Sequence, residues 1–101
     1  MDIYITQLIY VLNGEEKTFN QFESIAIPLI AKYNGTLLLR LKPEQQQFIE
    51  INIEMPYEIH LIRFESDKDF RDFMEDKERK LFLHLKDRSI RSTVLIKGTK
   101  L

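Results

Sequence analysis

The chain has no cysteine and only three glycines and three prolines among its 101 residues. Without cysteine there can be no disulfide, no thiolate nucleophile and no cysteine-ligated metal site. Three scattered glycines cannot form a phosphate-binding loop, and the low glycine and proline content leaves no low-complexity linker. These absences exclude several classes of site before any residue is assigned a role.

Long hydrophobic runs and a strong net charge are also missing. No segment approaches the roughly 18 consecutive apolar residues of a membrane span, and the N-terminus lacks the basic start and apolar run of a signal peptide. The net charge is −1, so no overall field attracts polyanions. We therefore expect a cytoplasmic protein with no membrane partner.

The charge is nevertheless uneven along the chain. Between Lys77 and Leu101 there are eight basic residues, opposed only by Glu78 and Asp87. Such a run is typical of a solvated helix face followed by a basic tail. An anion-binding patch is the alternative interpretation of the same residues.

Four short segments are apolar on both faces when they are drawn as strands, which place alternate side chains on opposite sides. They lie at residues 3–12, 36–42, 57–64 and 92–97. Only two segments have helical periodicity, one ending before Asn34-Gly35 and one at about residues 67–86. Two helices can cover one face of a four-stranded sheet. The simplest cover for the other face is a second copy of the chain.

The order of these elements is β-α-β-β-α-β, which predicts one α+β domain over residues 1–101. This is the ferredoxin-like arrangement, a four-stranded antiparallel sheet with both helices on one face. Right-handed crossovers place the strands in the order 4-1-3-2. In residues 44–54, Ile49, Ile51 and Ile53 alternate with polar residues, which is a half-buried strand pattern. We expect this segment to lie as an arm at the sheet edge or across a partner.

The second helix has recognisable start and packing patterns. Ser66 followed by Asp69 resembles a capping box. We expect its inner stripe to consist of Phe70, Phe73, Met74, Leu81 and Leu85.

His60 is the strongest candidate for a functional side chain because it lies in an otherwise aliphatic strand. If Phe64 faces the helices, so do Ile62 and His60. A buried histidine is either satisfied by a neighbouring polar group or serves as a pocket acid, base or hydrogen-bond donor. We predict His60 as the candidate catalytic residue.

Four further residues are candidates for ligand binding: Tyr33, Arg40, Arg63 and His84. Arg40 and Glu58 are placed to pair across the hairpin. Arg63 is expected on the face opposite Phe64, where it would bridge subunits or bind an anion. The two histidines lack the i, i+4 spacing of a zinc pair, so we predict no metal site. With no phosphate-binding glycine loop either, we predict no cofactor.

RNA-binding modules share the ferredoxin-like topology. They stack bases on aromatic side chains within a basic, glycine-containing signature of the central strands. The predicted strand at residues 57–64 has no glycine, and the open face carries mainly aliphatic side chains. We therefore predict no nucleic-acid partner.

Three segments resemble the dimeric α/β-barrel superfamily, in particular its uncharacterised domains of unknown function related to antibiotic biosynthesis monooxygenase-like proteins. They are residues 32–35 (Lys-Tyr-Asn-Gly), 62–66 (Ile-Arg-Phe-Glu-Ser) and 70–74 (Phe-Arg-Asp-Phe-Met). The resemblance implies a homodimer whose sheets face each other and a pocket in each subunit between sheet and helices. Relatives include cofactor-free oxygenases, isomerase-like enzymes and proteins without known activity, so fold alone does not choose a function.

Two functions remain open from the sequence. The first is a protein that binds a small organic molecule without a metal, as a monooxygenase-like or isomerase-like enzyme or as a binding protein, with His60 in its pocket. The second is a non-catalytic dimer that senses a ligand or contacts another protein. The sequence does not decide whether turnover occurs.

Overall fold

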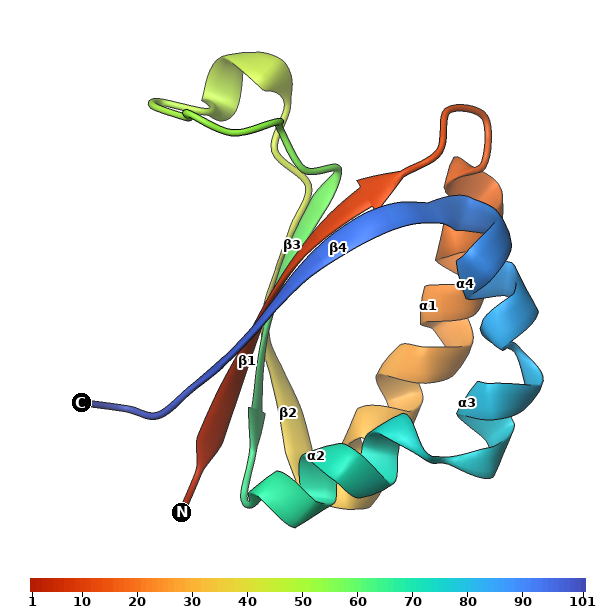
Figure 1. The fold of residues 1–101 in the computed structure, drawn as a ribbon, viewed down its shortest axis with the longest axis vertical. Helices are drawn as coiled ribbons and strands as arrows, with labels where there is room; N and C mark the ends of the chain where they lie inside the picture. The colour runs from red at the N-terminus through yellow and green to blue at the C-terminus, as the bar shows by residue number, and fades with distance from the viewer.

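Four antiparallel strands form one sheet in the order β2-β3-β1-β4, and the helices pack on one face of it (Figure 1). The computed structural model describes residues 1–101. The elements are β1 (Ile3–Val11), α1 (Glu16–Ile30), η1 (Ala31–Tyr33), β2 (Gly35–Leu41), η2 (Gln45–Gln47), β3 (Glu58–Phe64), α2 (Asp67–Met74), α3 (Lys77–Leu81), α4 (Leu83–Ser89) and β4 (Ile90–Gly98). The predicted ferredoxin-like α+β fold and strand order are confirmed. None of the helices is both long enough and apolar enough to cross a membrane.

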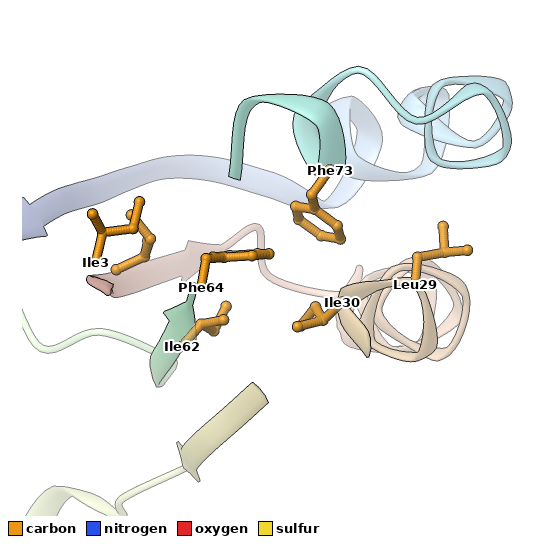
Figure 2. Close-up of a cluster of buried hydrophobic side chains, with 7 residues drawn as sticks. Ile3, Leu29, Ile30, Ile62, Phe64 and Phe73 are labelled. Carbon is orange, nitrogen blue, oxygen red and sulfur yellow. The ribbon is translucent and has the colours of Figure 1, made fainter. Parts of the chain in front are cut away.

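The strand register assigns each side chain of the sheet to one of two faces. Ile3 of β1 lies opposite Phe64 of β3, and Ile5 lies opposite Ile62. These four side chains are buried beneath the helices. Figure 2 shows the core that they form with side chains of α1 and α2, which consists of Ile3, Ile5, Leu29, Ile30, Ile62, Phe64 and Phe73. Because side chains alternate along a strand, His60 shares this inner face with Ile62 and Phe64, as predicted.

The turn after α1 brings β2 close to the core. Asn34 takes the left-handed conformation that ends this segment, with φ 58°. Gly35 is required because its neighbours leave no room for a side chain. A Cβ at this position would lie 2.6 Å from Cγ2 of Ile30 and 2.7 Å from Cε1 of Phe64, closer than packed atoms approach. The missing side chain therefore lets β2 lie against Phe64.

The opposite, outer face of the sheet remains uncovered by the chain's own helices. Its apolar side chains include Leu39 and Leu41 on β2 and Val94 and Ile96 on β4, which are 40–51% exposed. They lie beside outward side chains of the central strands, since Leu39 pairs with Leu61. The two apolar faces predicted from the sequence are therefore present, and only one is buried within a single chain.

The segment between β2 and β3 is not the strand that its alternating isoleucines predicted. After η2 it runs irregularly, with Ile49 fully exposed and Ile53 58% exposed. Glu44 and Gln47 form a capping box that folds η2 locally, and no neighbouring strand is present to pair with Ile49–Ile53. The hydroxyl of Tyr10 donates to the backbone oxygen of Glu54 at 2.8 Å, which anchors the end of the segment. The segment projects from the sheet away from the helices (Figure 1).

The predicted second helix is divided into α2, α3 and α4. Ser66 caps α2 by accepting a hydrogen bond from the backbone N–H of Asp69, as its sequence indicates. Asp76 then caps α3, because its Oδ1 accepts from the backbone N–H of Arg79 at 2.8 Å. This new start resets the helical phase, so Leu81 is 71% exposed and Arg79 is buried. The predicted inner position of Leu81 was therefore wrong.

Candidate functional site

A group of polar side chains is buried on the helix side of β3. Glu58 is 4% exposed and His60 is 1% exposed. Nε2 of His60 lies 2.6 Å from Oε1 of Glu58. Arg40, on the neighbouring strand β2, donates to the same carboxylate from Nε at 2.7 Å and from Nη2 at 3.1 Å. The pairing of Arg40 with Glu58 expected from the sequence is thus present, and it is shared with His60.

The hydrogen bonds to Glu58 fix its charge and the tautomer of His60. Burial alone would raise the pKa of Glu58, but the hydrogen bonds from His60 and Arg40 outweigh burial and hold that pKa below its usual value. An ionised carboxylate only accepts hydrogen bonds, so Nε2 of His60 carries the hydrogen between them. In the neutral ring this leaves Nδ1 as the acceptor. Glu58 therefore orients the imidazole as a carboxylate orients a catalytic histidine.

Glu23 approaches this group from α1. It is 6% exposed. Burial raises the pKa of its carboxyl group, while the positive charge of Arg40 acts in the opposite direction. Its environment thus differs from that of Glu58, which accepts three hydrogen bonds from two side chains. Two nearby carboxyl groups whose pKa values move in opposite directions are typical of acid-base sites, although structural ion pairs also produce such shifts.

A small cavity of about 40 Å³ adjoins these side chains. Judged by the volume that one water molecule needs, the cavity has room for roughly three waters. Its polar lining consists of Gln7, Glu23, His60, Arg79 and Lys86, and its apolar lining includes Phe22, Ala26, Ile62 and Phe73. The cavity is thus bounded by the sheet on one side and by helix side chains on the other. His60 is therefore adjacent to a cavity and not enclosed in a fully packed core.

The other candidates from the sequence lie apart from this cavity. Tyr33 donates from its hydroxyl to Oδ2 of Asp76 at 2.5 Å. Arg63 is on the outer face, where it pairs with Asp2 at 3.3 Å. His84 is exposed beside Phe82. The structure thus brings together His60 and Arg40 and separates them from the remaining three.

Sequence reasoning missed Glu23, Arg79, Lys86 and Gln7 as parts of this site. The pattern around Glu23 was available: it lies four residues after Phe19 and three before Ala26, within the apolar stripe of α1. A charged residue in a buried stripe is unusual unless it is paired or functional. Arg79 and Lys86 could not be placed, because the helix break at Asp76 determines which side chains of this region turn inward.

A larger hollow of about 630 Å³ lies at the other end of the sheet, beneath the segment between β2 and β3. Its charged groups already have partners. Arg91 forms an ion pair with Glu54, and the ammonium group of Lys42 lies 4.6 Å from the ring centre of Tyr57. No group of three or more histidine, aspartate or glutamate side chains is arranged to hold a metal ion. The His60 cavity is therefore the better candidate site.

The bond between Tyr33 and Asp76 predicts a pH dependence of stability. Hydrogen bonds from Tyr33 and from the backbone N–H of Arg79 lower the pKa of Asp76 from 3.8 to about 2. A lowered pKa stabilises the fold above pH 3.8, and this contribution is lost as the pH falls toward 2. Tyr33→Phe should lower the free energy of unfolding at pH 7 by about 1 kcal/mol, and this difference should narrow toward pH 2.

Urea unfolding between pH 2 and pH 7 measures this difference. Tyr4→Phe is the control, because the hydroxyl of Tyr4 makes no hydrogen bond within the chain and should leave the profile unchanged. A difference between Tyr33→Phe and the natural chain that stays constant across this pH range would contradict the assignment.

The fold and the buried site define a class, a ferredoxin-like α+β domain with an ionisable cavity between its sheet and helices. No family model matches the chain, and no curated protein matches it by sequence. Solved structures do. A protein of unknown function from Rhodopseudomonas palustris is 12% identical with a TM-score of 0.83, covering 99% of this chain and 82% of its own.

Two further solved structures resemble the chain over nearly their whole length. A Dabb family protein with a ferredoxin-like fold from Mesorhizobium loti is 13% identical with a TM-score of 0.73, covering 99% of this chain and 97% of its own. A dimeric ferredoxin-like protein of unknown function from Jannaschia is 12% identical with a TM-score of 0.74, and the similarity covers 99% of this chain and 100% of the Jannaschia chain. At these identities the similarity establishes the fold. The relation to monooxygenase-like proteins stays a prediction.

Proposed function

We propose that the chain binds a small organic molecule in the cavity between the sheet and the helices, with His60 as the group that exchanges a proton or a hydrogen bond with it. The observation that carries the proposal is the buried pair of His60 and Glu58 beside a cavity that Glu23 also lines. A histidine whose tautomer is fixed by a carboxylate is suited to general acid-base catalysis. An isomerase-like proton transfer requires only such groups and no metal.

The size of the cavity favours a second candidate function, a dimeric ligand sensor without turnover. At about 40 Å³ the cavity accommodates only a few atoms, whereas sites for drug-sized ligands enclose roughly 300–1,000 Å³. A larger ligand would have to displace α3 and α4. A change of conformation on binding is what a sensor requires. Both functions use the same cavity and are separated by whether the bound molecule is converted.

We also propose that two copies associate through their outer sheet faces. The support is the exposed apolar side chains of β2 and β4, represented by Leu39 and Ile96. An exposed apolar sheet face of this kind marks an association surface. The segment with Ile49 and Ile53 projects toward the same side (Figure 1), where a second copy would cover it. Similar solved proteins from Jannaschia and Bacteroides fragilis are described as dimeric.

A ligand screen tests the function proposed for the cavity. A metabolite library is added to the purified chain, and compounds that raise its melting temperature are collected. His60→Gln should abolish that rise, because it removes the imidazole ring that contacts the ligand. His84→Gln, which changes an exposed histidine outside the cavity, should leave it intact.

Analysis of the recovered compound then distinguishes the two candidate functions. If the chain converts the compound into a product, the enzyme function is supported. If the compound stabilises the chain and is recovered unchanged, the sensor function is supported. Equal stabilisation of the His60→Gln variant and the natural chain by every compound would refute the site.

A further inference from the structure

Arg79 is buried without a full set of hydrogen-bond partners. It is 7% exposed, and its guanidinium carbon lies 5.8 Å from the ring centre of Phe22 and 5.3 Å from that of Phe73. Nη1 donates to the backbone oxygen of Met74 at 3.3 Å. Nε has no partner. The aromatic rings stabilise the cation but offer no hydrogen-bond acceptor in the plane of the guanidinium group.

Lys86, on α4, adds a second cation to the same cavity. Burial lowers the pKa of its ammonium group, and the neighbouring charge of Arg79 lowers it further. Neither Arg79 nor Lys86 forms a salt bridge within the chain. Removing a cation from water is costly unless protein acceptors replace its hydration, and the backbone oxygen of Met74 is the only acceptor that these two side chains have within the chain.

The negative charge in the cavity does not balance these cations. Glu23 is the only carboxyl group that lines it, and burial favours the neutral form of that group by raising its pKa. Glu58, the other buried carboxylate of this region, is already occupied by Arg40 and His60. The cavity therefore has unused hydrogen-bond donors and an excess of positive charge.

We infer that Arg79 and Lys86 bind the anionic group of the cavity's ligand, and that this group is a carboxylate. This inference rests on the function proposed for the cavity and names the class of molecule that enters it. With Nη1 engaged by Met74, Nε and Nη2 form the free edge of the guanidinium group. That edge donates two parallel hydrogen bonds, which match the two oxygens of a carboxylate.

The position of this pair orients the ligand. Arg79 and Lys86 project from α3 and α4, while His60 and Gln7 project from the sheet, and all four line one cavity. A carboxylate held on the helix side therefore presents the rest of the molecule to His60. The free space of about 40 Å³ accommodates the carboxylate group, and a larger remainder of the ligand requires the helices to move away from the sheet.

The test compares acetate with acetamide, which has nearly the same shape but no charge. Binding is measured by calorimetry and by thermal shift at constant ionic strength. Because so small a ligand binds weakly, concentrations up to about 100 mM are used. We expect acetate to bind and raise the melting temperature, and acetamide to have no effect. Equal binding of acetate and acetamide would overturn the inference.

Substitutions then locate the site. Arg79→Met keeps most of the apolar stem and removes the charge, and we expect at least tenfold weaker acetate binding, equivalent to about 1.4 kcal/mol. Lys86→Met should weaken binding in the same direction and provides the readout if Arg79→Met does not fold. Lys77→Met, an exposed cation on the same helix as Arg79, should have no effect. Unchanged acetate affinity in both cavity variants would overturn the assignment.

The result also separates this inference from the proposed function. If an uncharged compound stabilises the chain through His60 while acetate does not bind, the cavity function stands and the carboxylate inference fails. If acetate binds through Arg79 but no compound of the screen depends on His60, the anion site stands and the proposed role of His60 fails.

Discussion

Glu58→Ala is expected to lower the free energy of unfolding by about 1.5–3 kcal/mol, the usual contribution of hydrogen bonds to a charged group, because Glu58 is buried but its partner Arg40 is partly exposed. The substitution leaves the guanidinium group of Arg40 and the ring of His60 without their shared acceptor. A domain of this size is stable by only about 5–15 kcal/mol, so a large part of the folded state's margin is lost. Urea unfolding at pH 7, followed by circular dichroism, measures the change.

The pKa of Glu58 adds a pH dependence to this loss. Because that pKa is held below its usual value of 4.5, the carboxylate contributes stability above that pH and loses the contribution as the pH falls through the lowered value. The difference between Glu58→Ala and the natural chain should therefore shrink in acid. Glu65→Ala, at an exposed carboxylate without a salt bridge, is the control and should change stability by less than about 0.5 kcal/mol. A loss of under about 1 kcal/mol for Glu58→Ala would contradict the role of this cluster.

Ile96→Glu is expected to weaken association of the two copies at least 100-fold, about 2.7 kcal/mol. Ile96 pairs with Thr6 of β1 and faces outward. In a twofold dimer each substitution occurs twice, so two carboxylates would enter the apolar interface. Sedimentation across micromolar concentrations measures the dissociation constant.

Leu95→Glu is the matched control for Ile96→Glu. Leu95 and Ile96 are adjacent on β4 and similarly exposed, at 47% and 51%. They point to opposite faces, because Leu95 pairs with Gln7, which lines the inner cavity. Leu95→Glu should leave the dimer intact. A natural chain that sediments as a single subunit at micromolar concentration would refute the proposed association.

The fold was predictable because the spacing of the apolar residues and the order of strands and helices along the chain determine it. Alternation in β1 and β3 defined both faces of the sheet, and Asn34-Gly35 marked the end of the first helical segment. Two elements were not predictable. The isoleucines at 49, 51 and 53 alternate as in a strand. A strand forms only where another strand pairs with it, and the sequence does not show whether a partner lies beside this segment. The division of α2 from α3 depends on Asp76, whose side chain caps a new helix rather than continuing the old one.

The candidate site was predictable only in part. His60 stood out because a polar residue in an aliphatic strand is unusual, and Arg40 was paired with Glu58 from their positions on a hairpin. The helix side of the cavity was not predictable, because the break at Asp76 determines which of the following side chains face the sheet. Without that break, a continuous helical stripe places Leu81 inward instead of Arg79, so the basic run of residues 77–101 could not be resolved into buried and exposed members.

The alternation along β3 makes one short segment serve two purposes. Glu58 and His60 point toward the helices, while Ile59 and Leu61 point outward. A point substitution here alters one side only. Inserting or deleting a single residue would instead exchange the two sets, turning the ionisable groups outward and burying isoleucine and leucine in their place. The length of this strand is therefore constrained more tightly than the identity of any one of its residues.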